Sequence, residues 1–158
     1  LAAGDNFSGW SKNEEFAVPG RDPYPTRATA EGWLAEDCLY VLREEGRIAA
    51  TMGTPLWQPE SYDRADWRTI AKPGEFMVVH TVAVHPDFLR RGYAARLMEF
   101  SINEARRAGL KSVRLDVCDI NKPAIGVYEK VGFQLVAQYN LFGLEPPYHL
   151  YRLYEYIL

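Results

Sequence analysis

A short stretch in the middle of the chain constrains the fold more than any other feature. The apolar run Phe76 to Val84 ends at a proline, and two arginines, Arg90 and Arg91, then lead to Gly92 and a helical pattern. Backbone N–H groups at a helix start have no partner inside the helix, and the peptide dipoles place partial positive charge there. Gly92 lets the backbone approach a bulky ligand, and the arginines add full charges. The stretch therefore predicts a strand, a loop and a helix that bind an anion with phosphate groups.

The glycine spacing does not fit the common nucleotide-binding loops, because neither G-x-G-x-x-G nor G-x-x-x-x-G-K-S/T occurs in the chain. An ordinary basic loop before an amphipathic helix would explain an isolated Arg-Arg-Gly equally well. The segment resembles the acyl-coenzyme A pyrophosphate loop of the GNAT superfamily of N-acetyltransferases, Gln/Arg-x-x-Gly-x-Gly/Ala. Gly92, Tyr93 and Ala94 match its second half, whereas Leu89 stands where the family usually has Gln or Arg.

A second motif follows the loop in the order that this family shows. Residues Asn121 to Phe133 read N-K-P-A-I-G-V-Y-E-K-V-G-F, which is similar to the family signature N-x-x-A-x-x-x-Y-E-K-x-G-F. The resemblance covers roughly residues 38 to 158 and is strongest from Phe76 to Phe133. It implies an α/β (α+β) fold with a mixed, mostly antiparallel central sheet. A parallel pair of strands would lie around the coenzyme site, with helices on both faces.

The length of 158 residues suits a single domain. Residues 1–37 contain much Gly, Pro, Asp and Asn and are expected to form an irregular arm, whereas residues 38–158 form the core. Members of the resembled family normally begin with a strand and a helix before the region that matches Cys38 onward. We therefore expect that an N-terminal strand and helix are absent from this numbering.

Side-chain periodicity predicts alternating strands and helices in the core. The predicted elements are a short helix from Thr29 to Ala35, a hairpin of Cys38 to Arg43 and Arg47 to Thr54, a central strand from Phe76 to Val84, a helix from Ala94 to Gly109, a strand around Val113 to Val117, a helix from Asn121 to Gly132, and an antiparallel pair, Phe133 to Tyr139 and Tyr148 to Ile157. A long connecting segment, Trp57 to Gly74, lies between the hairpin and the central strand, with one helical turn expected around Tyr62 to Trp67. Its aromatic side chains suit the wall of a substrate pocket or the anchors of a loop.

Composition and charge restrict the partners and the compartment. No apolar run approaches the ~20 residues of a membrane helix, so no membrane span is expected. The net charge of −3 argues against a nucleic-acid partner, which would require a basic face. Cys38 and Cys118 lie in apolar segments without metal-ligand spacing, which predicts buried reduced thiols, no metal site and a cytoplasmic location. The aromatic side chains of the last strand, Tyr148 to Ile157, predict a homodimer paired across that strand.

Acyl transfer to an amine needs a held acyl donor, a neutral amine and a proton for the departing thiolate. His80 is a candidate base, because imidazole titrates near neutrality and histidines occur at the corresponding place in the arylalkylamine acetyltransferases. The alternatives are a core histidine without a chemical role, or Glu75 as the base; Glu75 also suits a surface carboxylate. In the resembled family the tyrosine of Y-E-K-x-G-F lies close to the coenzyme sulfur and is often assigned as the general acid. The resemblance implies this role for Tyr128, and core packing is the alternative.

The resemblance also implies a coenzyme site. Pantetheine would bond to the backbone of Val82 and Val84, in a gap between diverging strands, and strand alternation predicts that Val78, His80, Val82 and Val84 share one face. The expected coenzyme-binding residues are Val82, Ala83, Val84, Leu89, Arg90, Arg91, Gly92, Tyr93, Ala94, Ala95, Asn121, Ala124 and Tyr128.

Together these patterns predict an N-acetyltransferase that passes an acetyl group from acetyl-coenzyme A to a primary amine. The amine, on a small molecule or a peptide, would attack directly in a ternary complex without a metal. The alternative is a non-catalytic acyl-coenzyme A binding or sensing module, for which Leu89 and the unidentified base leave room. The acceptor is not determined, because acceptor pockets in this family are built from segments that vary freely.

Overall fold

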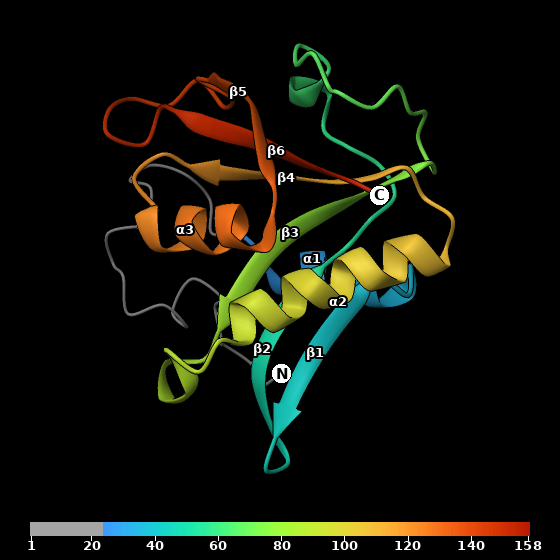
Figure 1. Cartoon of the computed structure of the whole chain (residues 1–158). Helices are drawn as coiled ribbons and strands as arrows, with labels where there is room; N and C mark the ends of the chain where they lie inside the picture. The colour runs from blue at the N-terminus through green and yellow to red at the C-terminus, as the bar shows by residue number, and fades with distance from the viewer. Residues whose placement is uncertain (1–23) are drawn as a thin grey trace.

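A six-stranded sheet runs through the part of the chain that the computed structural model describes, residues 24–158 (Figure 1). The strands follow the order β1-β2-β3-β4-β6-β5, and only β3 and β4 are parallel neighbours. The strands are β1 (Leu39–Glu44), β2 (Arg47–Gly53), β3 (Phe76–Val84), β4 (Ser112–Cys118), β5 (Gln134–Tyr139) and β6 (Tyr151–Ile157); the helices are α1 (Arg27–Ala35), α2 (Tyr93–Arg107) and α3 (Lys122–Val131), with short 3-10 helices η3 (Glu60–Tyr62) and η4 (Pro86–Phe88). The predicted mixed, mostly antiparallel sheet with one parallel pair is confirmed.

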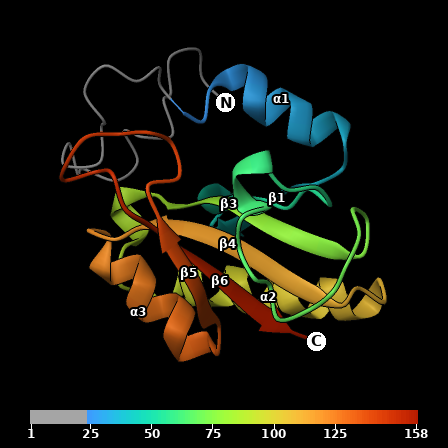
Figure 2. The same cartoon turned by 90° about the horizontal axis from the view of Figure 1, so that it is seen from above.

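Helices cover both faces of this sheet. Figure 2 shows α2 and α3 on one face, and α1 with the segment between β2 and β3 on the other. Met77 and Val79 of β3 belong to the apolar cluster on the α2 side, whereas Phe76 and Val78 belong to the cluster on the opposite side. Because successive side chains of a strand point to opposite faces, β3 contributes to both halves of the core. This explains why nearly every residue of that strand is apolar.

Local capping signals fix the helix ends. Asn121 accepts the N–H of Ala124 at 3.2 Å, and Gly132 ends α3 in the left-handed region, as predicted. The predicted start of α1 at Thr29 is wrong. Thr26 is the N-cap, because its hydroxyl accepts the N–H of Thr29 at 3.2 Å and Thr29 closes the capping box from the third helical position. Most of the predicted arm, residues 1–23, lies outside the described residues.

The chain ends in an inner strand of the sheet. β6 pairs with β4 on one side and with β5 on the other, and Tyr154 in its middle is fully buried. The predicted dimer pairing across this strand is therefore wrong, because its backbone groups are already used on both sides. The strands at the two edges of the sheet are β1 and β5.

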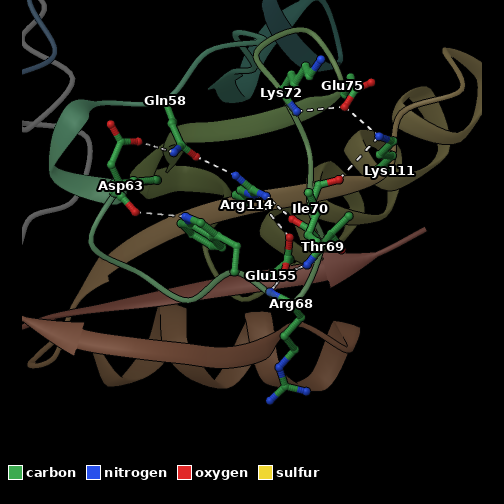
Figure 3. Close-up of polar contacts among 12 residues, drawn as sticks. Gln58, Asp63, Arg68, Thr69, Ile70, Lys72, Glu75, Lys111, Arg114 and Glu155 are labelled. Carbon is green, nitrogen blue, oxygen red and sulfur yellow. Dashed lines mark hydrogen bonds and ion pairs between the residues drawn. The ribbon is translucent and has the colours of Figure 1, made fainter.

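A buried ion pair fixes the long segment between β2 and β3, residues 54–75, on the sheet. Arg114 of β4 and Glu155 of β6 are register partners, and the Arg114 Nε lies 3.2 Å from Glu155 Oε1 (Figure 3). The guanidinium also donates to the Gln58 side chain at 2.8 Å and to the carbonyl of Thr69 at 2.9 Å. It lies between two aromatic rings, those of Trp67 and Phe76, at 4.4 and 4.3 Å from the ring centres.

Glu155 binds the same segment from the other side of the pair. Its second oxygen accepts the backbone N–H groups of Arg68 and Thr69 at 2.8 and 3.2 Å. The predicted helical turn of the segment lies earlier than expected, at η3, and Tyr62 in η3 is fully buried. The segment is thus a packed cover of the sheet rather than a free loop.

Neither a disulfide nor a membrane helix occurs among the described residues. Cys38 is buried, Cys118 is half-buried, and both are free thiols whose pKa values burial raises. No helix within residues 24–158 has the length and apolar composition needed to cross a bilayer.

Candidate functional site

The loop between β3 and α2 presents a row of backbone donors. Arg90 and Gly92 have left-handed φ values of +62° and +76°, so the backbone curls just before the helix begins. The N–H groups of residues 90–95 find no acceptor within the described part of the chain. A Cβ added at Gly92 would meet nothing within 4 Å, so the surface there is open. Donors converging at a helix start, with the helix dipole behind them, suit an anion.

The side chains around this loop add charge unequally. Arg91 lies 3.4 Å from Glu44 and over the ring of Phe88 at 5.2 Å, so part of its charge is already compensated. Arg90 is exposed and forms an ion pair with none of the residues described, which makes it the freer cation. Tyr93 is buried and its hydroxyl donates to Glu44. The Leu89 side chain is half exposed and has no polar group to offer a ligand.

The two parallel strands separate just beside this loop. Their pairing ends at Val79 and Leu115, although β3 continues to Val84 and β4 to Cys118. Beyond this point β3 pairs only with β2 and β4 only with β6. The β4-facing backbone groups of residues 80–84 therefore have no strand partner within the described chain, and they can bond to an extended ligand.

A bulge at this point changes which way the side chains of β3 face. Thr81 has a φ of +49°, and the register with β2 shifts next to it. Val82 and Val84 pack on the α2 side, whereas Val78 packs on the opposite side. The prediction that Val78, His80, Val82 and Val84 share one face is therefore wrong. The extra residue of the bulge interrupts the alternation on which that prediction depended.

His80 lies on the α1 side of the sheet among aromatic rings. Its ring centre is 6.2 Å from that of Trp33, stacked at 13°, and 6.1 Å from that of Trp57. Trp33 in turn covers Gly53, the β2 partner of His80, where a Cβ would meet the indole at 2.6 Å. His80 Nε2 is buried without a hydrogen-bond partner among the described residues. Burial lowers the pKa of His80, so the ring is neutral near pH 7 and able to accept a proton.

Tyr128 approaches the same point from α3, on the other face. It is 8% exposed and packs on Phe133 at 6.3 Å between ring centres. Its hydroxyl forms no hydrogen bond with the described residues. Burial, and secondarily the charge of Asp116, raise the pKa of Tyr128 well above that of a free phenol. The hydroxyl therefore keeps its proton at neutral pH and is available as a donor.

Asp116 also belongs to this group, and its role is not indicated by the sequence motifs. It follows Leu115, the last paired residue of β4, and it accepts a hydrogen bond from the buried hydroxyl of Tyr62. Its charge acts on the pKa values of both His80 and Tyr128. In the sequence it reads as an outward polar residue alternating with Val117. Two charged residues, Arg114 and Asp116, alternate with the apolar residues of this strand, and they were the available sign in the sequence that this face of the strand carries buried polar groups.

Two other predicted site residues, Glu75 and Asn121, have structural partners, and Glu75 lies away from His80. Glu75 precedes β3, pairs with Lys111 at 2.7 Å, and stands five positions before His80, about 16 Å along an extended strand. Hydrogen bonding to Lys111 lowers the pKa of Glu75 below that of a free carboxyl group. The structure does not bring Glu75 to the group around His80. Asn121 caps α3 through Ala124, at the end of β4 that lies nearer the loop.

No cluster of three or more His, Cys, Asp or Glu side chains that could hold a metal occurs among residues 24–158. The site is instead composed of backbone donors, a neutral imidazole, a protonated phenol and one carboxylate. Such a set can bind a phosphate-bearing ligand and move protons beside it.

Comparison with known proteins agrees with this reading. The model of the acetyltransferase (GNAT) family matches residues 9–133. A mycothiol acetyltransferase from Saccharomonospora viridis is 31% identical over 110 residues, 69% of this chain and 34% of that protein. A ribosomal protein bS18 alanine N-acetyltransferase from Salmonella typhimurium is 42% identical over 52 residues, 33% of this chain and 35% of that protein. The chain thus spans about a third of the length of these curated relatives.

The fold also has solved counterparts. A putative acetyltransferase from Salmonella typhimurium, solved with its cofactor acetyl-CoA, superposes with a TM-score of 0.62. The two sequences are 21% identical, and the match covers 81% of this chain and 69% of that one. The likeness shows a shared fold.

Proposed function

Because this chain belongs to the GNAT family of acetyltransferases, we propose that it transfers an acetyl group from acetyl-coenzyme A directly to a primary amine. The observation that carries the proposal is the row of backbone N–H groups at residues 90–95, placed beside the point where β3 and β4 separate. The loop before α2 supplies backbone donors for phosphates, and the open edge of β3 supplies backbone groups for an extended ligand. Pyrophosphate and pantetheine, the two parts of coenzyme A, have these chemistries.

The residues present fit this cosubstrate. The pyrophosphate would lie against the N–H groups of residues 90–95, beside the Arg90 guanidinium, which forms an ion pair with none of residues 24–158. The pantetheine arm would bond to the open backbone of residues 82–84, which leads toward Tyr128. When bound, acetyl-coenzyme A supplies the activated acyl group, and the chain's own residues orient it and move the protons.

Two side chains suit the proton steps. His80 is neutral near pH 7, so it can take the proton that the amine loses as the new C–N bond forms. Tyr128 keeps its proton and can donate it to the departing thiolate. The two groups approach the separated strands from opposite faces of the sheet. A base and an acid on the two sides of the acyl group would prevent each from neutralising the other directly.

One curated relative is named as an N-acetyltransferase of an alanine of a ribosomal protein, which supports an amine as the acceptor. The other is named for mycothiol. We therefore propose a small-molecule amine or a peptide amine for this chain, with Trp33 and Trp57 beside the amine at His80.

Thiol release from acetyl-coenzyme A tests the proposal. The protein is mixed with pooled amines that include amino acids, polyamines, aminoglycosides and short peptides, and free thiol is measured with a chromogenic disulfide. We expect one pool to accelerate release at least tenfold over the amine-free rate. Coenzyme binding by calorimetry without acceleration by any pool would favour the alternative, a binding or sensing module.

A further inference from the structure

Asp116 and His80 occupy equivalent positions on the two parallel strands. The register pairs Val79 with Leu115, so the next residue of each strand is His80 on β3 and Asp116 on β4. Neighbouring strands lie about 4.8 Å apart, and in-register residues of a parallel pair point to the same face. The carboxylate and the imidazole therefore begin side by side, at the position where the strands start to diverge.

Tyr62 orients the carboxylate. The Tyr62 side chain is fully buried and its hydroxyl donates to Asp116. The carbonyl of Tyr62 accepts the indole N–H of Trp67 at 3.0 Å, and the Trp67 ring contacts the Arg114 guanidinium. The donor to Asp116 is thus part of the segment that the buried ion pair fixes on the sheet. A carboxylate with such a donor has a defined direction.

We propose that Asp116 is a positioning residue for acetyl transfer, which stabilises the positive charge that His80 acquires when it takes the proton of the acceptor amine. The inference rests on the proposed function. The proton moves from the amine nitrogen to the imidazole as the C–N bond forms, and Asp116 stays ionised throughout. Tyr62 holds the carboxylate in place and transfers no proton.

The charge of Asp116 acts on the pKa values of four groups within residues 24–158, namely Tyr62 from η3, His80 from β3, Tyr128 from α3 and Cys118 from β4 itself. Arg114 stands two positions before Asp116 on the same face of β4, where its guanidinium pairs with Glu155. The two phenols and the thiol have raised pKa values and are neutral near pH 7. Within the described residues, Asp116 is thus the charge that acts on His80. An anion favours the protonated imidazole, so removing it should lower the pKa of His80 further.

A histidine titration followed by NMR tests this coupling without any acceptor. The chain has three histidines, and the His80 signal is identified by its absence from the His80→Gln spectrum. Asp116→Asn should lower the measured pKa of His80 by about 1, and leave His85 and His149 unchanged. Asp63→Asn is the matched control, because Asp63 is an exposed carboxylate on the 54–75 segment, next to Tyr62. A His80 pKa within 0.3 (about the precision of such titrations) of wild type in Asp116→Asn would overturn the proposal.

The pH profile of kcat/KM supplies a second readout. With an acceptor from the amine pools, Asp116→Asn should move the acidic limb to lower pH by the same amount and reduce the plateau roughly 10- to 100-fold. The KM for acetyl-coenzyme A should not change. General damage to the fold would lower activity equally at every pH, and that result would overturn the proposal. If Asp116→Asn fails to fold, Tyr62→Phe takes its place, because it keeps the buried ring and removes only the donor to Asp116. This variant should lower kcat about fivefold at constant KM for acetyl-coenzyme A. An unchanged kcat would overturn the proposal.

The two proposals fail in different ways. A lowered His80 pKa in Asp116→Asn, with no thiol release from any amine pool, overturns acetyl transfer and supports the coupling. Normal thiol release with an unmoved His80 pKa overturns the coupling alone.

Discussion

Replacing Arg114 by methionine should cost the protein a large part of its folding free energy. The substitution keeps an apolar stem between Trp67 and Phe76, whose ring centres lie 4.4 and 4.3 Å from the guanidinium carbon. It removes the hydrogen bonds to Gln58 and to the Thr69 carbonyl, and it takes the cation away from Glu155. The Glu155 carboxylate, 1% exposed, is then left in the interior without a counter-charge.

Breaking a buried pair from one side typically costs about 3–5 kcal/mol. Domains are stable by about 5–15 kcal/mol, so the expected loss ranges from a fifth of the folding free energy to all of it. For a chain of this size each kcal/mol lowers Tm by about 2–4 °C, which predicts a fall of about 6–20 °C. The loss of such a pair should also loosen the 54–75 segment, since two of the lost contacts bind that segment directly.

Urea unfolding followed by tryptophan fluorescence measures this change. Arg27→Met is the control, because Arg27 is exposed and its ion pair with Glu31 on α1, at 2.7 Å, is a surface pair with little effect on stability. Isolated buried pairs often recover when both partners become apolar. Here the Arg114→Met, Glu155→Met double variant should stay destabilised. Glu155 also accepts the N–H groups of residues 68 and 69, each costing about 1–3 kcal/mol when left unpaired. An unfolding free energy of Arg114→Met within about 1 kcal/mol of wild type, the cost of one ordinary hydrogen bond, would refute this reasoning.

Three further substitutions test the proposed site. Gly92→Val should abolish coenzyme A binding in calorimetry, because φ is +76° there and the side chain would fill the open space in front of the N–H groups that the ligand needs. The control Gly109→Val, at a φ of +68° beyond the other end of α2, imposes similar backbone strain and should bind coenzyme A normally. Equal coenzyme A affinities of the Gly92→Val and Gly109→Val variants would show that the loop between β3 and α2 is not the site. Tyr128→Phe should lower turnover about 100-fold with coenzyme affinity unchanged, whereas Tyr40→Phe on β1 should have no effect. Burial lowers the pKa of His80, so protonation of His80 should reduce wild-type activity only below pH 7. His80→Ala should suppress turnover there, and the loss should shrink as pH rises and free amine becomes abundant; turnover within twofold of wild type in both His80→Ala and Tyr128→Phe would exclude both proton roles.

Features of the fold with local signals could be predicted from the sequence. The apolar spacing in α2 places Leu97, Met98 and Ile102 in the core, and Asn121 and Gly132 bound α3 as expected. Capping and amphipathic spacing act within a few residues, so the sequence around them contains the information. The donor row at residues 90–95 follows from the same local logic, because it is a property of a glycine at a helix start.

The parts that the sequence did not indicate depend on distant neighbours. Asp116 becomes a neighbour of His80 only because β3 and β4 pair in one register and then separate. Thr81 gives no warning of its bulge, since β-branched residues rarely adopt a positive φ. The inner position of β6 is a matter of strand order, which aromatic content does not reveal. Trp33 was expected on a short helix before the core, and nothing in the sequence indicated that this helix would pack over His80.

The bulge at Thr81 has a consequence for how such a protein can diverge. His80 precedes the bulge and faces the layer made by α1 and the 54–75 segment, and the bulge turns Val82 toward the layer made by α2 and α3. The first layer comes from the chain before β3, and the second comes from the chain after it. Mutations in the early part can therefore change which molecule reaches His80 without disturbing residues 90–95. A chimera that receives residues 54–75 from a relative should inherit that relative's acceptor preference and keep its own coenzyme affinity.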